Sequence, residues 1–265
     1  MKALLDRLRR HREARSLVRR AVPDDLWRLT LARLPFLARR SEDELRSLRR
    51  LVSLFLDSKE FMGAGGLVVD DAIAVSIAAQ ACLPVLKLGL APYQGFVGIV
   101  VQADEVSAQR SVTDDDGIVH EYTEHLTGEA VAGGPVMLSW RDVELSGESA
   151  EWGYNVVIHE FAHVLDMADG QATGMPPLPS AAARRAWSDT MEHEFAAFCA
   201  AVDSGQETLL DPYGATAMPE FFAVAVESFF VTPNDTRAAH PALYRMFADY
   251  FQQDPARDEC LTRLG

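Results

Sequence analysis

The pentapeptide His159-Glu160-Phe161-Ala162-His163 has the residue types and the spacing needed to hold and use a metal ion. Residues four apart lie on one face of a helix, so both imidazoles can bind the same ion. Glu160 is turned by about 100° from His159 and can reach a water on the metal without binding the metal itself. This H-E-x-x-H pattern is typical of zinc metalloproteases, in which the glutamate is the general base.

A catalytic zinc site also needs a third protein ligand and an open position for water. The other five histidines show no spacing that extends the pattern, whereas Pro219 to Glu227 forms an apolar helical segment with two carboxylates. Glu220 and Glu227 are seven residues apart and share one side of this helix. One of them can bind the metal while the other accepts a hydrogen bond from a ligand histidine. The alternative is that both are solvated helix carboxylates.

Length and composition are ordinary for a soluble globular protein, and one compact catalytic domain with a short appendage is the simplest organisation. The chain has 265 residues, of which 48% are hydrophobic and 24% charged. No apolar run is long enough to span a bilayer, and the arginine-rich N-terminus lacks the apolar core of a signal peptide. Three separated cysteines without a C-x-x-C pair indicate reduced thiols and a cytoplasmic location.

The charge is distributed unevenly along the chain. Residues 1–50 carry 15 Lys and Arg against 7 Asp and Glu, although the whole chain has a net charge of −14. The acidic remainder argues against direct nucleic-acid binding. We therefore divide the chain into a basic helical N-terminal extension, residues 1–40, and a catalytic domain, residues 41–265. The basic segment is either a solvated helix face or a contact for an acidic partner.

Hydrophobic periodicity and turn signals predict a mostly helical α+β fold. Ser41 and Glu44 form a capping box at the start of a helix. We further predict a charged helix over 2–20, an apolar connector over 26–37, a buried helix over 73–88, strands over 96–101 and 136–140, and helices over 154–169, 180–202, 219–232 and 241–251.

Several longer segments carry a resemblance to a known family. They include F-M-G-A-G-G-L-V-V-D-D, G-P-V-M-L-S-W-R-D-V, N-V-V-I-H-E-F-A-H-V-L-D-M-A-D-G and Y-G-A-T-A-M-P-E-F-F-A-V-A-V-E-S-F-F, within residues 41–255. On these residues the chain resembles the Mlc titration factor A family of zinc-dependent peptidases, whose active site is similar to that of lethal-factor-type proteases. The resemblance implies a zincin-like domain with a small twisted β-sheet.

The resemblance also implies roles for single residues. It assigns one Zn²⁺ per chain to His159, His163 and Glu220, leaves Glu227 at most a supporting role, and places Tyr213 to hydrogen-bond the oxyanion. Asp166 supports the helix or a ligand, or is a structural cap. The family has Asn or Asp and then Pro before the ligand glutamate, whereas Ala217 and Met218 stand here, so Thr216 is a substitute helix cap or the cap is lost.

The implied activity is hydrolysis of short peptides, as an aminopeptidase, by a zinc-activated water with Glu160 as general base. We expect the strand over 136–140 to be an edge strand that aligns the peptide substrate, or else an interior structural strand. The alternative function is a regulatory binding protein that sequesters a transcriptional repressor of Mlc type.

Overall fold

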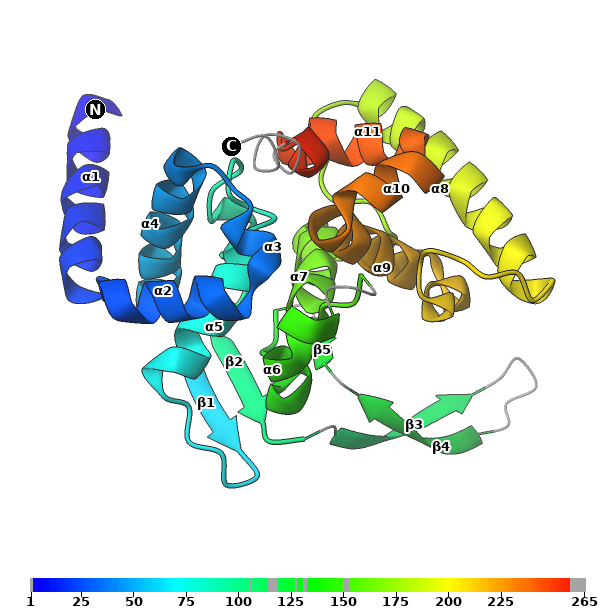
Figure 1. Ribbon diagram of the computed structural model, residues 1–265, viewed down its shortest axis with the longest axis horizontal. Coiled ribbons are helices and arrows are strands. Elements are labelled where there is room, and N and C mark those ends of the chain that lie inside the picture. Colours follow the sequence, from blue (N-terminus) through cyan, green and yellow to red (C-terminus); the bar gives the residue numbers. More distant parts are fainter. Residues whose placement is uncertain are drawn as a thin grey trace.

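Helices make up most of the fold, and a small sheet lies to one side of them (Figure 1). The computed structural model describes residues 2–104, 106–113, 119–126, 128–130, 133–149 and 153–257. Its α-helices are α1 (Lys2–Arg19), α2 (Asp24–Arg33), α3 (Pro35–Ala38), α4 (Glu42–Ser58), α5 (Asp71–Cys82), α6 (Trp140–Ser149), α7 (Val156–Asp166), α8 (Ala181–Asp203), α9 (Met218–Val231), α10 (Pro233–Ala239) and α11 (Pro241–Phe251). Short 3₁₀ turns are η1 (Ala91–Tyr93), η3 (Met167–Asp169) and η4 (Pro212–Thr216).

The described strands form one four-stranded mixed sheet and a separate hairpin. The sheet has the order β1-β2-β6-β5, in which β1, β2 and β6 are parallel and β5 is antiparallel to β6. These strands are β1 (Glu60–Ala64), β2 (Gly98–Gln102), β6 (Val136–Ser139) and β5 (Gly128–Ala130). The hairpin of β3 (Val106–Thr113) and β4 (Val119–Leu126) lies between β2 and β5 in sequence.

The strand for which the sequence left an edge or an interior position open is an interior strand. β6 pairs with β2 on one side and with β5 on the other, so both of its backbone edges are used. The edge position beside helix α7 belongs to β5, which the sequence analysis did not predict. Three residues, Gly-Glu-Ala, are too few to show a strand pattern. An apolar run predicts a strand but does not say which neighbours pair with it.

The helices predicted within residues 41–265 are confirmed, and the two caps predicted at Ser41 and Ser180 are present. Ser41 Oγ accepts the Glu44 N–H at the start of α4, and Ser180 Oγ accepts the Ala183 N–H at the start of α8. The helix predicted over 73–88 is shorter than expected, because α5 ends at Cys82. An α+β fold, mostly helical with a small sheet, is therefore confirmed.

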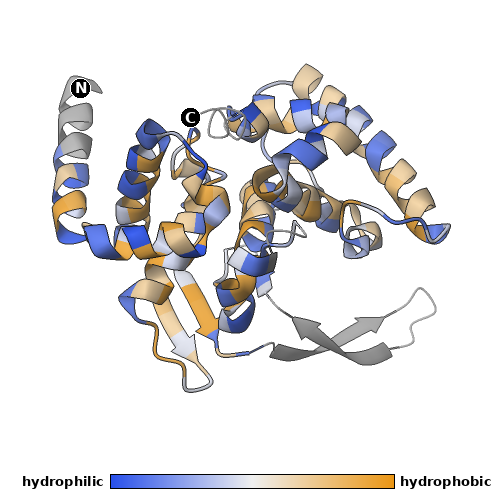
Figure 2. Ribbon diagram, in the orientation of Figure 1, coloured by the Kyte–Doolittle hydropathy of each residue, from blue (hydrophilic) through white to orange (hydrophobic). Residues whose placement is uncertain are grey.

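Helices α5, α7 and α9 form the centre of the core. Every residue of α9 from Phe221 to Val231 is buried, and such a helix needs packing partners on all sides. Much of α9 and strand β2 are coloured as hydrophobic in Figure 2. Among the residues that the structure describes, no helix is both long and apolar enough to cross a membrane.

The segment predicted as an apolar connector is helical instead. Acidic Asp24 and Asp25 begin α2 and Arg33 ends it, an order that suits the helix dipole, and Pro35 begins α3. The two helices bury Trp27, Phe36 and Leu37 in the main core. The division of the chain at residue 40 stays a prediction, but residues just before it pack tightly on the rest.

Helix α1 packs along α4, at the opposite end of the molecule from α8 (Figure 1). Arg19 and Ser16 both bond the Asp57 carboxylate, with Ser16 Oγ donating at 2.6 Å. Arg50 of α4 pairs with Glu13 of α1 at 2.7 Å. Arg19 of the basic N-terminal segment thus meets an acidic side chain of the chain itself, and Glu13 of the same segment meets a basic one.

A buried polar network fixes the start of α7. Asn155 is the N-cap, and its Oδ1 accepts the Ile158 N–H at 2.9 Å. Its Nδ2 donates to Gln80 Oε1 of α5 at 2.7 Å, and its backbone N–H donates to Glu227 of α9. Asn155 therefore joins the three central helices at one point.

Asp166 fixes the end of the same helix. Its fully buried carboxylate accepts the backbone N–H groups of Gly174 and Met175, each at 2.8 Å. Trp187 of α8 donates to the Gly174 carbonyl at 2.9 Å. Asp166 therefore has a structural role: its carboxylate holds the loop after α7 against the end of that helix. Of the roles that the sequence left open, this is the structural one.

Replacing Asp166 by Ala should lower the free energy of unfolding by about 2–3 kcal/mol, because two backbone N–H groups lose their acceptor. Asp166→Asn keeps one acceptor oxygen and should lose less. Urea unfolding followed by tryptophan fluorescence measures both variants. Equal stability of Asp166→Ala and the natural protein would contradict this structural role.

Candidate metal centre

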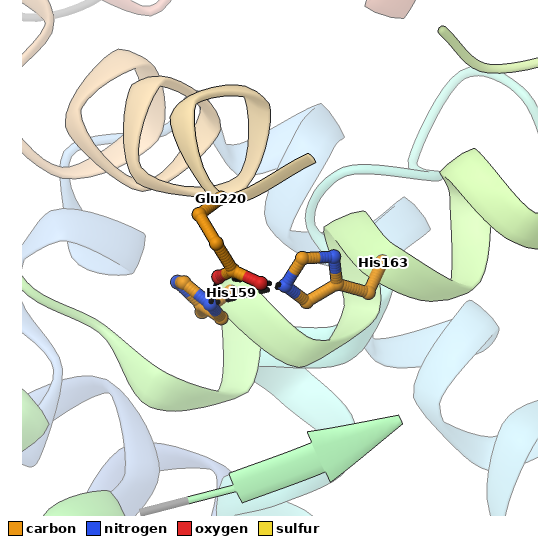
Figure 3. Close-up of side chains that lie close together, drawn as sticks. All are labelled: His159, His163 and Glu220. Carbon is orange, nitrogen blue, oxygen red and sulfur yellow. Dashed lines mark hydrogen bonds and ion pairs between the residues drawn. The ribbon is translucent and has the colours of Figure 1, made fainter. Parts of the chain in front are cut away.

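Three side chains from two helices point at one another (Figure 3). His159 and His163 come from α7, and Glu220 comes from the first turn of α9. The Nε2 atom of His159 lies 3.1 Å from His163 Nε2 and 3.1 Å from Glu220 Oε2. The third distance, between His163 Nε2 and Glu220 Oε2, is 3.2 Å.

These three atoms have the spacing of metal ligands. A tetrahedral ion with bonds of about 2.0 Å separates its ligand atoms by about 3.3 Å, close to the observed distances. Two neutral imidazole nitrogens that face each other with lone pairs repel unless a proton or a cation lies between them. Imidazole and carboxylate donors also suit a divalent transition metal. The His/Glu cluster is therefore a fitting site for a metal ion.

Glu227 lies behind His159 and orients its ring. Glu227 Oε1 is 2.7 Å from His159 Nδ1, and the Glu227 side chain is only 2% exposed. With Nδ1–H donating to Glu227, the Nε2 lone pair faces the centre of the cluster. Burial alone would lower the pKa of His159, but the hydrogen bonds with Glu220 and Glu227 raise this pKa above its ordinary value. The surroundings of the His159 ring therefore favour a positive charge. The geometry thus places Glu220 in the cluster and Glu227 outside it.

The surroundings of Glu220 favour its ionised form. Burial opposes its ionisation, yet the hydrogen bonds from His159 and His163 bring its pKa well below the ordinary value. The positive end of the α9 dipole also favours a carboxylate in the first turn. The N-cap, Ala217, makes no side-chain cap, and Thr216 Oγ1 donates to the Tyr213 carbonyl at 2.7 Å instead. The suggestion that Thr216 caps α9 was wrong.

Glu160 is buried beside the cluster without binding into it. Within the described residues its Oε2 atom is buried and has no hydrogen-bond partner. Burial raises the pKa of Glu160 to about 7, against the opposing effect of His159 and His163. A buried carboxylate oxygen with no protein partner, next to a metal site, can accept a proton from a small molecule there.

A cavity of about 290 Å³ opens onto these side chains. Tyr213, on η4, stands at the cavity with its side chain about half exposed, and its ring centroid is 6.2 Å from that of His159. Strand β5 forms another wall. The cavity is lined by Gly128, Glu129, Ala130, His159, Glu160, His163, Met167, Ala172, Tyr213, Pro219 and Glu220.

The structure adds three residues that the sequence analysis did not single out. Gln80 and Asn155 hold the start of helix α7, and Glu129 lines the cavity. A glutamine inside an otherwise apolar helix and an asparagine before an apolar run were available signals, since such residues need buried partners or cap helices. No signal marked Glu129.

Comparisons with known proteins identify the family of this chain. The model of the glucose-regulated metallo-peptidase M90 family matches residues 7–252. An uncharacterized protein of Synechocystis sp. is 33% identical over 243 residues, which cover 91% of this chain and 88% of that protein. Mlc titration factor A of Klebsiella pneumoniae is 33% identical, and that of Cronobacter sakazakii 32%, each over 86% of both chains. The resemblance seen in the sequence is confirmed, and the chain belongs to the M90 family of metallopeptidases with a zincin-like α+β fold.

Proposed function

We propose that this protein is a zinc-dependent peptidase that hydrolyses short peptides. The observation that carries the proposal is a buried Glu160 oxygen, without a hydrogen-bond partner among the described residues, beside three converging ligand atoms in an open cavity. A structural zinc site has four protein ligands and is closed. Here His159, His163 and Glu220 would hold one Zn²⁺ per chain and leave a position open toward the cavity.

In this proposal each side chain has a defined task. Zinc held by these three side chains would act as a Lewis acid, which polarises the scissile carbonyl and lowers the pKa of a bound water. Glu160 accepts the proton of the attacking water and passes it to the leaving amine. Tyr213 donates a hydrogen bond to the developing oxyanion. The outer edge of β5 aligns the extended peptide through main-chain hydrogen bonds.

The charge of the cavity supports action on a free amino terminus. Three glutamates line the cavity, Glu129, Glu160 and Glu220, and its described lining includes no lysine or arginine. Glu129 lies on β5, the strand that we expect to align the peptide. A carboxylate on that strand can receive the ammonium group of a short peptide. We therefore propose aminopeptidase activity, with Glu129 as the amine acceptor.

A second candidate function is favoured by the relatives. Two of them bear the name Mlc titration factor A, which describes titration of Mlc. We propose that this chain also binds a transcriptional repressor of Mlc type, as a protein partner outside the catalytic cavity. For both functions we propose a cytoplasmic location, which the unpaired Cys82 and Cys199 support.

Replacing Glu160 by Gln should lower the turnover of peptide substrates by about 10²–10⁴-fold, because the amide cannot accept the proton. Elemental analysis should still find one zinc per chain in both proteins, since Glu160 is not a ligand. Repressor binding, measured by calorimetry, should be unchanged. Full turnover of Glu160→Gln would show that the base is misassigned.

Tyr213→Phe should reduce kcat by about 10-fold or more and leave KM nearly unchanged, because the lost hydrogen bond forms mainly in the transition state. Steady-state kinetics on a chromogenic aminoacyl substrate measures the two constants. A change in KM alone would place Tyr213 in substrate binding rather than in oxyanion stabilisation.

Glu129→Gln should raise KM for peptides with a free amino terminus by about 10-fold, because a charge-assisted hydrogen bond is weakened. N-acetylated forms of the same peptides should be poor substrates for both proteins. Efficient cleavage of the acetylated peptides by the natural protein would exclude aminopeptidase specificity.

A further inference from the structure

Strand β5 lies unusually close to the carboxylate of Glu160. A Cβ atom placed on Gly128 would be 2.5 Å from Glu160 Oε1, 2.6 Å from its Cγ and 2.7 Å from its Cδ. Non-bonded carbon and oxygen atoms are at optimal separation near 3.5 Å or more, so these distances are steric clashes. At position 128 only glycine leaves the Glu160 side chain where it is.

Position 128 needs a glycine because there is no room for a Cβ atom, and not because of the backbone conformation. Eight glycines of the described residues have a positive φ, which favours glycine, and Gly128 is not one of them. Its backbone is that of an ordinary strand, paired with Leu138 of β6. An alanine could adopt the same backbone, and the three atoms nearest to its Cβ would all belong to Glu160.

The two backbones are each held by contacts of their own. Strand β5 is paired with β6, whose Leu138 is 1% exposed in the core. Helix α7 is fixed at its two ends by Asn155 and Asp166. The part that can shift is the Glu160 side chain, whose torsions are freer than either backbone.

We propose that Gly128 is a positioning residue for the general base. Its missing side chain lets the β5 backbone press against the Glu160 carboxylate and hold it beside the metal ligands. This inference rests on the proposed role of Glu160. The contact also sets the Glu160 carboxylate at a fixed distance from β5, the strand that we expect to align the peptide. The same strand would therefore position both the base and the scissile bond.

The test compares Gly128→Ala with Gly98→Ala, a matched control in the same sheet. A Cβ on Gly98 would be 3.4 Å from Pro135 Cβ, an ordinary contact. Gly128→Ala should keep one zinc per chain and lose about 10–100-fold in kcat with little change in KM, because a misplacement near 1 Å has effects of this size. Gly98→Ala should retain kcat. Natural kcat in folded Gly128→Ala would overturn the proposal.

A stability cycle tests the contact without any catalytic readout. Gly128→Ala should lower the urea midpoint in the natural background, but not in Glu160→Ala, where the clashing atoms are absent. An equal loss in both backgrounds would overturn the proposal, because the glycine would then serve the sheet alone. If Gly128→Ala fails to fold, a folded Gly128→Ala/Glu160→Ala double variant supports the contact and an unfolded one overturns it.

The two hypotheses can fail separately. If the natural protein binds zinc but cleaves no peptide of a broad panel, the proposed function fails, and the urea midpoints alone decide the Gly128–Glu160 contact. If the natural protein cleaves peptides and the midpoint loss does not depend on Glu160, only the positioning role fails. Aspartate is one methylene shorter than glutamate and leaves room for a Cβ at position 128. Glu160→Asp should therefore lower kcat less in the Gly128→Ala background than in the natural protein.

Discussion

The hydrogen bond between His159 Nδ1 and Glu227 Oε1 is the interaction on which the site depends. It joins α7 to α9 in the apolar core, where an unpaired carboxylate would be costly. It also sets the ring so that Nε2 faces Glu220. Because Glu220 and Glu227 are two helical turns apart on one side of α9, one imidazole meets both carboxylates, one at each ring nitrogen.

Around this bond, several polar side chains lie among helices that are otherwise apolar, and they form hydrogen bonds with one another. Gln80, Asn155 and Glu227 are all nearly inaccessible to solvent, and they form a chain from α5 through the N-cap of α7 to α9. Hydrogen bonds of this kind are stronger in a low-dielectric interior, and leaving one unmade is costly. The network therefore specifies one relative placement of three helices that apolar packing alone would not fix.

Local features of the fold could be predicted from the sequence because they depend on spacing. The metal helix and the caps at Ser41 and Ser180 follow from residues within one or two turns. The choice between Glu220 and Glu227 depends on how α9 lies against α7, which seven-residue spacing cannot tell. Strand order is a long-range property too, so the sequence left β6 either at an edge or in the interior, and the three-residue β5 gave no pattern. Tertiary packing likewise made two helices of the supposed connector over 26–37.

The burial of Glu160 connects the metal site with the chemistry proposed for it. Burial raises the pKa of this carboxyl to about 7, so without a cation a large share of it is protonated at neutral pH. A divalent cation held by His159, His163 and Glu220 would favour the ionised form, since an opposite charge within a few ångströms stabilises the carboxylate. The apolar surroundings and the cation therefore act in opposite directions on one group. In the proposed reaction the base gains its full proton-accepting form only when the metal is present, and the same buried position keeps bulk water from competing with the one water that it must deprotonate.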